Sequence, residues 1–252
     1  MNTSVSYRYQ LASQIKGIVI YYLIVLCVSV LVIATSTVAI SISSADDGLS
    51  GQIVGTEFAT IIYLFVAACN SFREEFGMLM QNATSRKSLF IGRILTTLTI
   101  SSFMVIMDKL IYFINRAAYS DDKYVVLSFF DSFYNTNSDS FKLQITGFFF
   151  HLSFNLFASG LGYLLTNIFY RSGKGGRLGL CVGLPVGIVV VLPIVDSIIA
   201  KGKISEAIFR GLDKILGVSA QKPLYGIISC FLIFTGLSAI SWLLIRRANV
   251  KE

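Results

Sequence analysis

The sequence predicts an all-α membrane protein with six transmembrane helices. Hydrophobic residues make up 54% of the 252-residue chain, charged residues make up 14%, and the mean hydropathy is +0.71. A soluble domain carries about a quarter charged residues, so this chain is too apolar to be one. Its apolar runs are continuous rather than alternating, which favours helices over a transmembrane β-barrel. We expect residues 1–252 to form a single transmembrane domain.

Six segments are long and apolar enough to cross a membrane, which takes about 20 residues in a helix. The first apolar run is too long for a cleavable signal peptide. The four cysteines fall within these segments, show no C-x-x-C spacing, and are interpreted as small apolar residues. The expected spans are 17–42, 53–70, 91–113, 143–169, 178–200 and 224–245.

Two segments outside the spans have the pattern of helices that lie in the membrane interface. Residues 5–16 predict an amphipathic N-terminal helix before the first span, with Tyr7 and Tyr9 at the depth of the headgroups. Residues 203–217 have one apolar face and predict a second interfacial helix, before the last span. The largest external loop is rich in aromatic residues, and we expect it to rest on the membrane surface. The external loops are 43–52, 115–142 and 201–223.

The distribution of basic residues predicts the orientation. Six crossings place both termini on one side, and that side carries more Lys and Arg than the other. Because such an excess marks the cytoplasm, we expect a multi-pass protein of the plasma membrane with cytoplasmic termini. The net charge of +7 then reflects topology and contact with anionic lipids. The chain has no basic stripe with interleaved aromatic residues, so nucleic acid is not an expected partner.

Glycine recurs every four residues in the fifth expected span, at Gly179, Gly183 and Gly187. This stripe predicts a surface where another helix packs closely. Pro185 and Pro193 in the same span predict a bend. The seam is compatible with a moving helix and equally with ordinary packing inside the chain.

The sequence offers little for catalysis, and no catalytic or metal-binding residue is predicted. It contains no phosphate-binding loop, so ATP would have to be hydrolysed by another polypeptide. The only histidine, His151, stands four residues before Asn155; together with Glu74–Glu75 it is faintly similar to the intramembrane glutamate proteases of the CAAX-processing type. Leu79 replaces the arginine of that family, and its second histidine is missing. An intramembrane enzyme that uses His151 and Glu74/Glu75 is therefore kept as an alternative only.

Ionisable residues inside a membrane are costly and need an explanation. Glu57, Asp108, Lys109 and Asp196 fall near the outer ends of the expected spans, where their side chains can reach the interface. No series of acids suitable for a proton or sodium relay is evident. A gradient-driven secondary transporter is accordingly the second alternative.

The loop 71–92 is the most informative part of the chain. Phe72, Phe76, Leu79 and Met80 recur at helical spacing, whereas Arg73, Glu74 and Glu75 fall on other faces. A surface helix of this kind suits docking of a partner from the cytoplasm. The plain alternative is a solvated helix in a turn.

Residues 71–95 resemble the first cytoplasmic loop of ABC-2-type ABC transporter permeases. That loop has an acidic residue, a nearby glycine, an apolar stretch, a Ser-Arg pair and a glycine before the third span. The sequence departs from it in having Ala83–Thr84 in place of a proline and Arg93 in place of a lysine. The matching residues are Glu74–Glu75, Gly77, Leu79–Met80, Ser85–Arg86 and Gly92.

The resemblance implies a transmembrane permease subunit of an ATP-driven exporter. In that family, two permease chains, identical or related, form the path, and two ABC ATPase subunits bind ATP and Mg²⁺, so this chain needs no cofactor of its own. The loop helix docks on the ATPase; Phe76, Leu79 and Met80 would supply its apolar anchor, and Glu74 and Glu75 would contact the ATPase or the N-terminal helix. The coupling residues implied are Phe72, Arg73, Glu74, Glu75, Phe76, Gly77, Leu79, Met80, Ser85, Arg86 and Lys87.

The cargo implied is amphipathic or apolar. The chain lacks large soluble domains and deep charges, and this argues against a hydrophilic small solute. An antimicrobial or toxin peptide, a lipid or a hydrophobic drug fits better. Small exporters of the kind that this chain resembles often carry such peptides, so the resemblance favours a peptide cargo.

Overall fold

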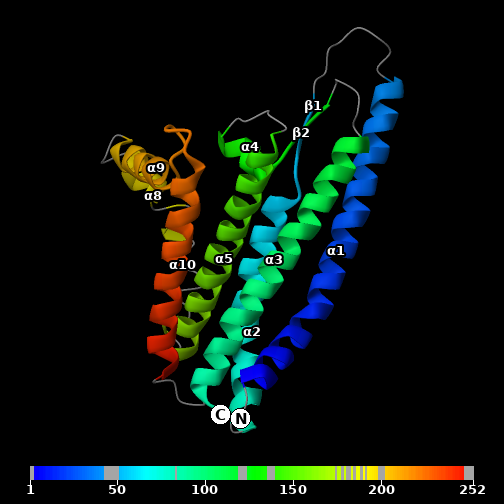
Figure 1. Ribbon diagram of the computed structural model, residues 1–252. Coiled ribbons are helices and arrows are strands. Elements are labelled where there is room, and N and C mark those ends of the chain that lie inside the picture. Colours follow the sequence, from blue (N-terminus) through cyan, green and yellow to red (C-terminus); the bar gives the residue numbers. More distant parts are fainter. Residues whose placement is uncertain are drawn as a thin grey trace.

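The protein is a bundle of long helices with a small cap at one end (Figure 1). The computed structural model describes residues 3–42, 51–82, 84–118, 124–134, 140–173 and 202–246, and, between 175 and 197, positions 175–176, 179, 183, 186–187, 190 and 192–197. Within these ranges the side chains of 33–42, 51–54, 72–74, 124–126 and 192 are not described.

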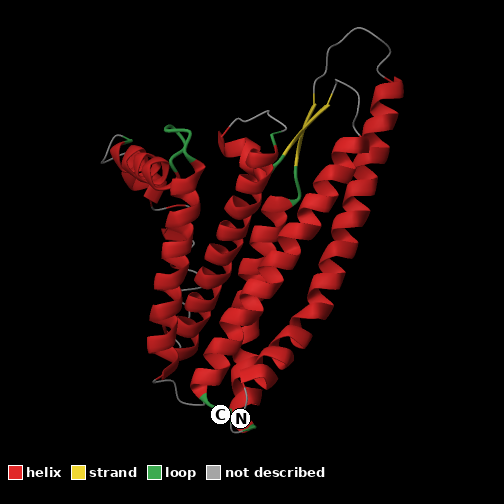
Figure 2. Cartoon of the chain, viewed as in Figure 1, coloured by secondary structure: helices red, strands yellow, loops and turns green. Residues whose placement is uncertain are grey.

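Among the described residues, five long helices run along the bundle, and the short elements gather at the end away from the start of α1 (Figures 1 and 2). The long helices are α1 (Thr3–Ile42), α2 (Glu57–Gln81), α3 (Arg86–Ala118), α5 (Phe141–Arg171) and α10 (Pro223–Arg246). The short elements are β1 (Gly51–Val54), β2 (Tyr124–Leu127), α4 (Phe129–Tyr134), α8 (Leu192–Val195) and α9 (Lys203–Leu216). The start of α1 and the end of α10 lie at the same end of the bundle.

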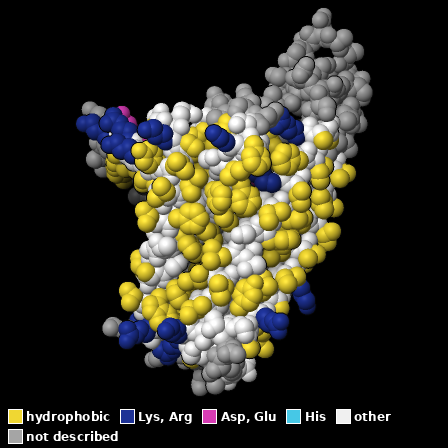
Figure 3. All heavy atoms as spheres, in the orientation of Figure 1, with side chains coloured by type: hydrophobic (Ala, Val, Ile, Leu, Met, Phe, Trp, Pro, Cys, Tyr) yellow, Lys and Arg dark blue, Asp and Glu magenta, His cyan; other side chains and the backbone are white. Residues whose placement is uncertain are grey.

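Four of the described helices are long and apolar enough to cross a membrane: α1, α3, α5 and α10. The prediction of a helical membrane protein is confirmed at this level. α2 is long but carries Glu57 at its start and Arg73–Glu75 near its end, and only scattered positions of the expected span 178–200 are described. Apolar side chains cover the middle of the surface in Figure 3, and Lys and Arg side chains lie toward its two ends.

α5 is the centre of the bundle and packs mainly against α2 and α10. Glycines on α5 make both contacts close. A Cβ at Gly162 would lie 2.5 Å from the Phe65 carbonyl oxygen, and one at Gly160 would lie 2.9 Å from the Phe234 ring. By contrast, a Cβ at Gly179, Gly183 or Gly187 would meet nothing within 4 Å in the described part of the chain. Most of the residues around this stripe lie outside the described part, so the predicted glycine seam, within the chain or with a second chain, stays a prediction.

The cap contains a short parallel sheet that the sequence did not predict. β1 pairs with β2 in register from Gly51 with Tyr124 to Val54 with Leu127. The Gly55 N–H then donates to the Leu127 carbonyl at 2.9 Å. The expected loops 43–52 and 115–142 thus meet each other, although residues 43–50, 119–123 and 135–139 lie outside the described residues.

Three aromatic residues of the loop 115–142, which the sequence predicts to be external, pack into the protein rather than resting on the membrane surface. Phe129, Phe130 and Tyr134 of α4 are buried against Phe150 of α5, with ring centroids 5.4–5.7 Å from the Phe150 ring. Apolar burial favours this arrangement, because six further aromatic or apolar side chains pack against these four buried rings. The loop therefore closes one end of the bundle.

α9 lies at this same end and has the predicted amphipathic character. None of its residues is buried, and Ile208, Phe209 and Leu212 are exposed. Its N-terminus is held by Asp196, whose carboxylate accepts the backbone N–H groups of Ile204 and Ser205. At its C-terminus Asp213 accepts the Ser219 N–H at 2.8 Å, and this hydrogen bond lowers the pKa of the Asp213 carboxyl.

Candidate functional site: two buried polar clusters

The first turns of α1 are built into the bundle rather than lying apart as a separate interfacial helix. α1 is continuous from Thr3 to Ile42, and Ser6 and Gln10 are fully buried. The Gln10 amide donates to the Ser6 hydroxyl and to the Leu89 carbonyl, each at 3.2 Å. A Cβ at Gly92 would lie 2.8 Å from the Ser6 hydroxyl oxygen, so the close approach of α1 to α3 requires a glycine there.

A buried ion pair lies one turn further along the same contact. Arg93 Nη1 is 3.4 Å from Glu75 Oε2, and both side chains are at most 5% exposed. The Gln14 amide donates to Glu75 Oε1 at 3.4 Å, and the Arg93 guanidinium lies 5.2 Å from the centroid of the Tyr163 ring. We call Gln14, Glu75, Arg93 and Tyr163 the Glu75–Arg93 cluster. It joins α1, α2, α3 and α5, and losing one charge would leave the other buried and unpaired.

The predicted coupling helix is the last part of α2, not a separate surface helix. Phe76 and Leu79 are buried in a cluster with Leu89, Tyr163 and Ile245. The prediction that these two side chains anchor a partner from the cytoplasm is therefore wrong for this conformation, because their contacts are inside the chain. Gly77 and Met80 are half-buried, and the side chains of Phe72, Arg73 and Glu74 lie outside the described part.

The exposed positions at this end lie around the α2–α3 turn. Met78, Ser85 and Lys87 are exposed, as are Gln81 and Asn82. Arg86 is half-buried and donates to the Arg246 carbonyl at 2.6 Å, which ties the start of α3 to the end of α10. Of the predicted coupling residues with described side chains, Ser85 and Lys87 are thus the most accessible.

A second polar cluster lies near the capped end, where α2, α3 and α5 meet. We call Glu57, Asp108, Lys109 and His151 the His151 tetrad. Lys109 Nζ is 3.1 Å from Glu57 Oε1, His151 Nδ1 is 3.9 Å from the same oxygen, and His151 Nε2 is 3.6 Å from Asp108 Oδ2. Glu57, Asp108 and His151 are at most 1% exposed, and the Lys109 side chain is 12% exposed.

Hydroxyl and backbone donors complete the tetrad. The Thr60 hydroxyl donates to Asp108 Oδ1 at 3.0 Å, and the Tyr22 hydroxyl lies 3.1 Å from the same oxygen and 2.9 Å from the Met104 carbonyl, so its one proton is shared between them. The Phe129 backbone N–H donates to Glu57 Oε2. Helix α1 and the cap are therefore both attached to this cluster.

The sequence did not reveal the tetrad. Glu57 and Asp108 do not reach the interface as expected; both are buried, and they face the two ring nitrogens of His151 from helices that are far apart in the chain. Asp196 likewise is buried and caps α9. The available signal was the His151–Asn155 spacing, which continues every four residues along α5. His151, Asn155, Ser159, Tyr163 and Asn167 are all buried.

This polar stripe of α5 connects the two clusters. It begins at His151 in the tetrad and reaches Tyr163 in the Glu75–Arg93 cluster, about 18 Å further along the helix at 1.5 Å per residue. Both polar atoms of the Asn155 amide lack a hydrogen-bond partner within the described part of the protein. A buried amide without a partner is costly, so the stripe is a functional candidate.

The structure does not bring together the residues of the enzyme alternative, His151 and Glu75. Glu75 lies on α2 about 27 Å from Glu57 along the helix axis, and Glu57 is the residue that contacts His151. His151 and Glu75 therefore do not meet. Among the described residues, no group of three or more His, Cys, Asp or Glu side chains has a geometry that could hold a metal ion.

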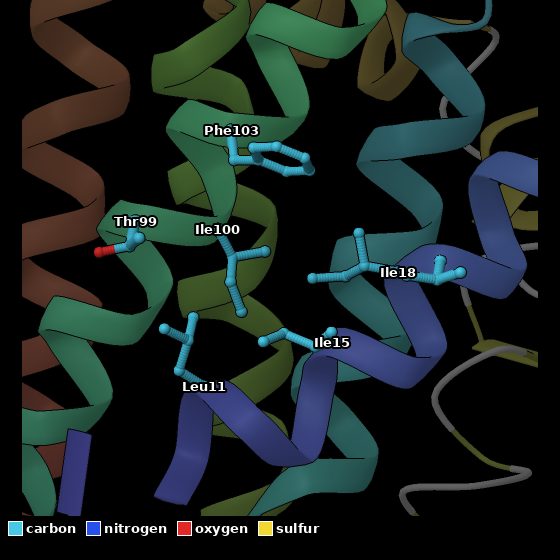
Figure 4. A pocket seen from close by; sticks show the side chains of 7 residues that line it. Leu11, Ile15, Ile18, Thr99, Ile100 and Phe103 are labelled. Atoms are coloured by element: carbon cyan, nitrogen blue, oxygen red, sulfur yellow. The ribbon is translucent and has the colours of Figure 1, made fainter. Parts of the chain in front are cut away.

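An apolar hollow of about 340 Å³ opens between α1 and α3, where the side chains of both helices surround it (Figure 4). Its lining is almost entirely aliphatic or aromatic and lies next to the exposed apolar face of α1. The lining residues are Leu11, Ile15, Ile18, Val19, Thr99, Ile100 and Phe103.

Comparisons with protein-family models, curated proteins and solved structures find no match to this chain.

Proposed function

We propose that this chain is the transmembrane permease subunit of an ATP-driven exporter of the ABC-2 type. Two copies, or one copy and a related chain, would form the path in the plasma membrane, and two separate ATPase subunits would hydrolyse ATP. The observation that carries the proposal is the Glu75–Arg93 cluster. It brings Glu75 and Arg93 of the 71–95 segment together with Gln14 from the amphipathic start of α1. This contact lies at the end of the bundle where α1 begins and α10 ends.

The direction of the helices is compatible with six crossings and with both termini on the same side of the membrane. α1 and α3 run toward the cap, whereas α2, α5 and α10 run away from it. α5 ends at Arg171 opposite the cap, and the next described helix, α8, lies at the cap beside α9. The end of α5 and the start of α8 thus lie at opposite ends of the bundle, which is compatible with a span over 178–200. With six crossings and cytoplasmic termini, the cap and α9 lie on the external side.

The cytoplasmic end offers a means of coupling to an ATPase. Glu75 and Phe76 hold α2 to α1, α3 and α5, so a push on the α2–α3 turn is transmitted to several helices at once. The exposed residues Met78, Ser85 and Lys87 are the contact points that we assign to the ATPase. Closure of the ATPase pair would shift the permease pair between inward-open and outward-open forms.

The hollow between α1 and α3 supports an apolar or amphipathic cargo. Its volume lies in the range of small-ligand pockets, at roughly 300–1,000 Å³, and its lining matches an acyl chain or an apolar peptide side chain. An antimicrobial or toxin peptide, a lipid and a hydrophobic drug each have such a part. Among these we favour the peptide, on the resemblance stated above.

The test uses exposed residues, because replacing buried Glu75 or Phe76 would disturb the fold itself. The chain is co-expressed with each ABC ATPase that a neighbouring reading frame encodes and is purified through its own tag. We expect the ATPase to co-purify with the wild-type chain. The Lys87→Glu and Met78→Asp variants should insert normally but lose most of the bound ATPase.

The control is Lys214→Glu on α9, at the opposite end, which should retain the ATPase. An absence of co-purification with every neighbouring ATPase would contradict the proposal. Export that survives ATP depletion but stops with an uncoupler would replace it by a gradient-driven carrier.

A further inference from the structure

We propose that the His151 tetrad is a proton-binding site inside the helix bundle, which holds one proton shared by His151 and Asp108. The geometry of the tetrad carries this inference, and it does not depend on the identity of an ATPase partner. The ligand is a single proton, and the site ties α1, α2, α3 and α5 together.

Charge balance requires the additional proton. With both carboxylates ionised, Lys109 protonated and His151 neutral, the tetrad carries one net negative charge. The tetrad lies in the interior, where an uncompensated charge is strongly disfavoured. One further proton makes the cluster neutral. Two carboxylates that share a buried site commonly retain a proton for this reason.

The contacts place the proton between His151 and Asp108. Glu57 already has Lys109 at Oε1 and the Phe129 N–H at Oε2, so both of its oxygens face donors other than the shared proton. Asp108 Oδ1 accepts the Thr60 hydroxyl and lies 3.1 Å from the Tyr22 hydroxyl, whose one proton is shared with the Met104 carbonyl. Asp108 Oδ2 and His151 Nε2 have no hydrogen-bond partner in the described part of the chain and face each other at 3.6 Å. The proton belongs to this pair rather than to either residue.

The groups that face the pair come from every helix packed around it. α1 contributes Tyr21 and Tyr22, and the Tyr21 hydroxyl is hydrogen-bonded to the Thr60 hydroxyl. α2 contributes Glu57. α3 contributes Lys109, which also lies 5.2 Å from the centroid of the Tyr112 ring. α4 presents the Phe129 ring, 6.0 Å from the His151 ring, whereas its Asp131 carboxylate is bonded to Ser128.

The polar stripe of α5 extends from this site toward the Glu75–Arg93 cluster. Asn155 and Ser159 follow His151 on the same helix face and lead to Tyr163 beside Arg93. Loss of the proton would leave the tetrad negatively charged and weaken the contact of α3 with α5. The site thereby links proton occupancy to helix packing.

The single histidine makes the test direct, because every histidine signal comes from His151. The full chain is labelled with ¹⁵N-histidine, purified with a tag that contains no histidine and placed in lipid nanodiscs at neutral pH. The two ring nitrogen shifts distinguish the imidazolium from the neutral tautomers. Infrared spectra of the same samples detect a protonated carboxyl, assigned to Asp108 by its loss in Asp108→Asn.

We expect one proton in the wild type, seen either as the imidazolium or as the protonated Asp108 carboxyl. Glu57→Gln removes one negative charge, so the proton should be lost and both signals should disappear. Lys109→Met removes the positive charge, so a second proton should be taken up and both signals should appear together. Glu206→Gln and Lys214→Met on the exposed surface of α9 repeat the two charge changes as controls, and they should match the wild type.

A neutral His151 and an ionised Asp108 in the wild type would overturn the proposal, and this measurement needs no variant. Identical signals in the wild type and Lys109→Met would overturn it as well. If Glu57→Gln does not fold, the opposite change in Lys109→Met still decides the charge-balance argument.

Discussion

At the scale of single residues, the closest contacts of this bundle depend on glycines in α5 and α3. Gly162 brings the backbone of α5 against the backbone of α2, and Gly160 brings it against α10. Gly92 admits the Ser6 side chain from α1. In a membrane, where apolar burial between helices gives little driving force, such close packing contributes much of the stability.

Gly162→Ala should therefore be destabilising. Its new Cβ would lie 2.5 Å from the Phe65 carbonyl oxygen and 3.1 Å from the Ala68 Cβ, so α2 and α5 would have to separate. Overpacking of this kind costs about 1–3 kcal/mol. We expect a lower apparent melting temperature of the purified protein in detergent.

The matched control is Gly183→Ala, where the new Cβ would meet nothing within 4 Å in the described part. Its melting temperature should equal that of the wild type. A Gly183→Ala protein less stable than Gly162→Ala would show that the glycine stripe predicted from the sequence is the true packing seam.

At the scale of elements, α9 combines an exposed apolar face with basic residues and no buried side chain. Phe209 is 70% exposed, and Arg210 forms an exposed ion pair with Glu206. Figure 3 shows Lys and Arg side chains at the corner where α9 lies, with apolar side chains beneath them. We expect such a helix to lie in the membrane interface, with its apolar face toward the acyl chains.

A tryptophan at Phe209 should report this contact. In a Trp242→Phe background, which removes the only native tryptophan, Phe209→Trp should show blue-shifted emission and strong quenching by brominated lipids. Glu206→Trp, on the polar face of the same helix, should be quenched far less. Equal quenching at both positions would contradict an interfacial orientation of α9.

At the scale of the whole molecule, the two ends of the bundle are formed by different elements. One end holds the start of α1, the α2–α3 turn and the end of α10, and the other holds the sheet, α4, α8 and α9. A buried polar cluster lies toward each end, and the α5 stripe runs between them. This polarity is what a protein requires if it receives a mechanical input on one side and acts on the other.

Cysteine accessibility should place the two ends on opposite sides of the membrane. Ser85 and Ala220 are both exposed, the first at the α2–α3 turn and the second after α9. In a background without the four native cysteines, a membrane-impermeant maleimide should label Ala220→Cys in intact cells. It should label Ser85→Cys only after permeabilisation. Labelling of Ser85→Cys from outside would exclude the proposed contact with a cytoplasmic ATPase.

The sequence determined the helical membrane class, the positions of α1, α3, α5 and α10, and the amphipathic α9, because length, hydropathy and helical periodicity are local properties. It also singled out Glu75, Gly92 and Arg93, which the structure brings to one end. Only the tertiary structure decided that α2 continues through the predicted coupling helix and that Phe76 and Leu79 face inward, since a helix pattern does not say which element covers its apolar face. It alone joined Glu57, Asp108, Lys109 and His151, because a buried charge cluster arises from the lateral packing of helices distant in the chain.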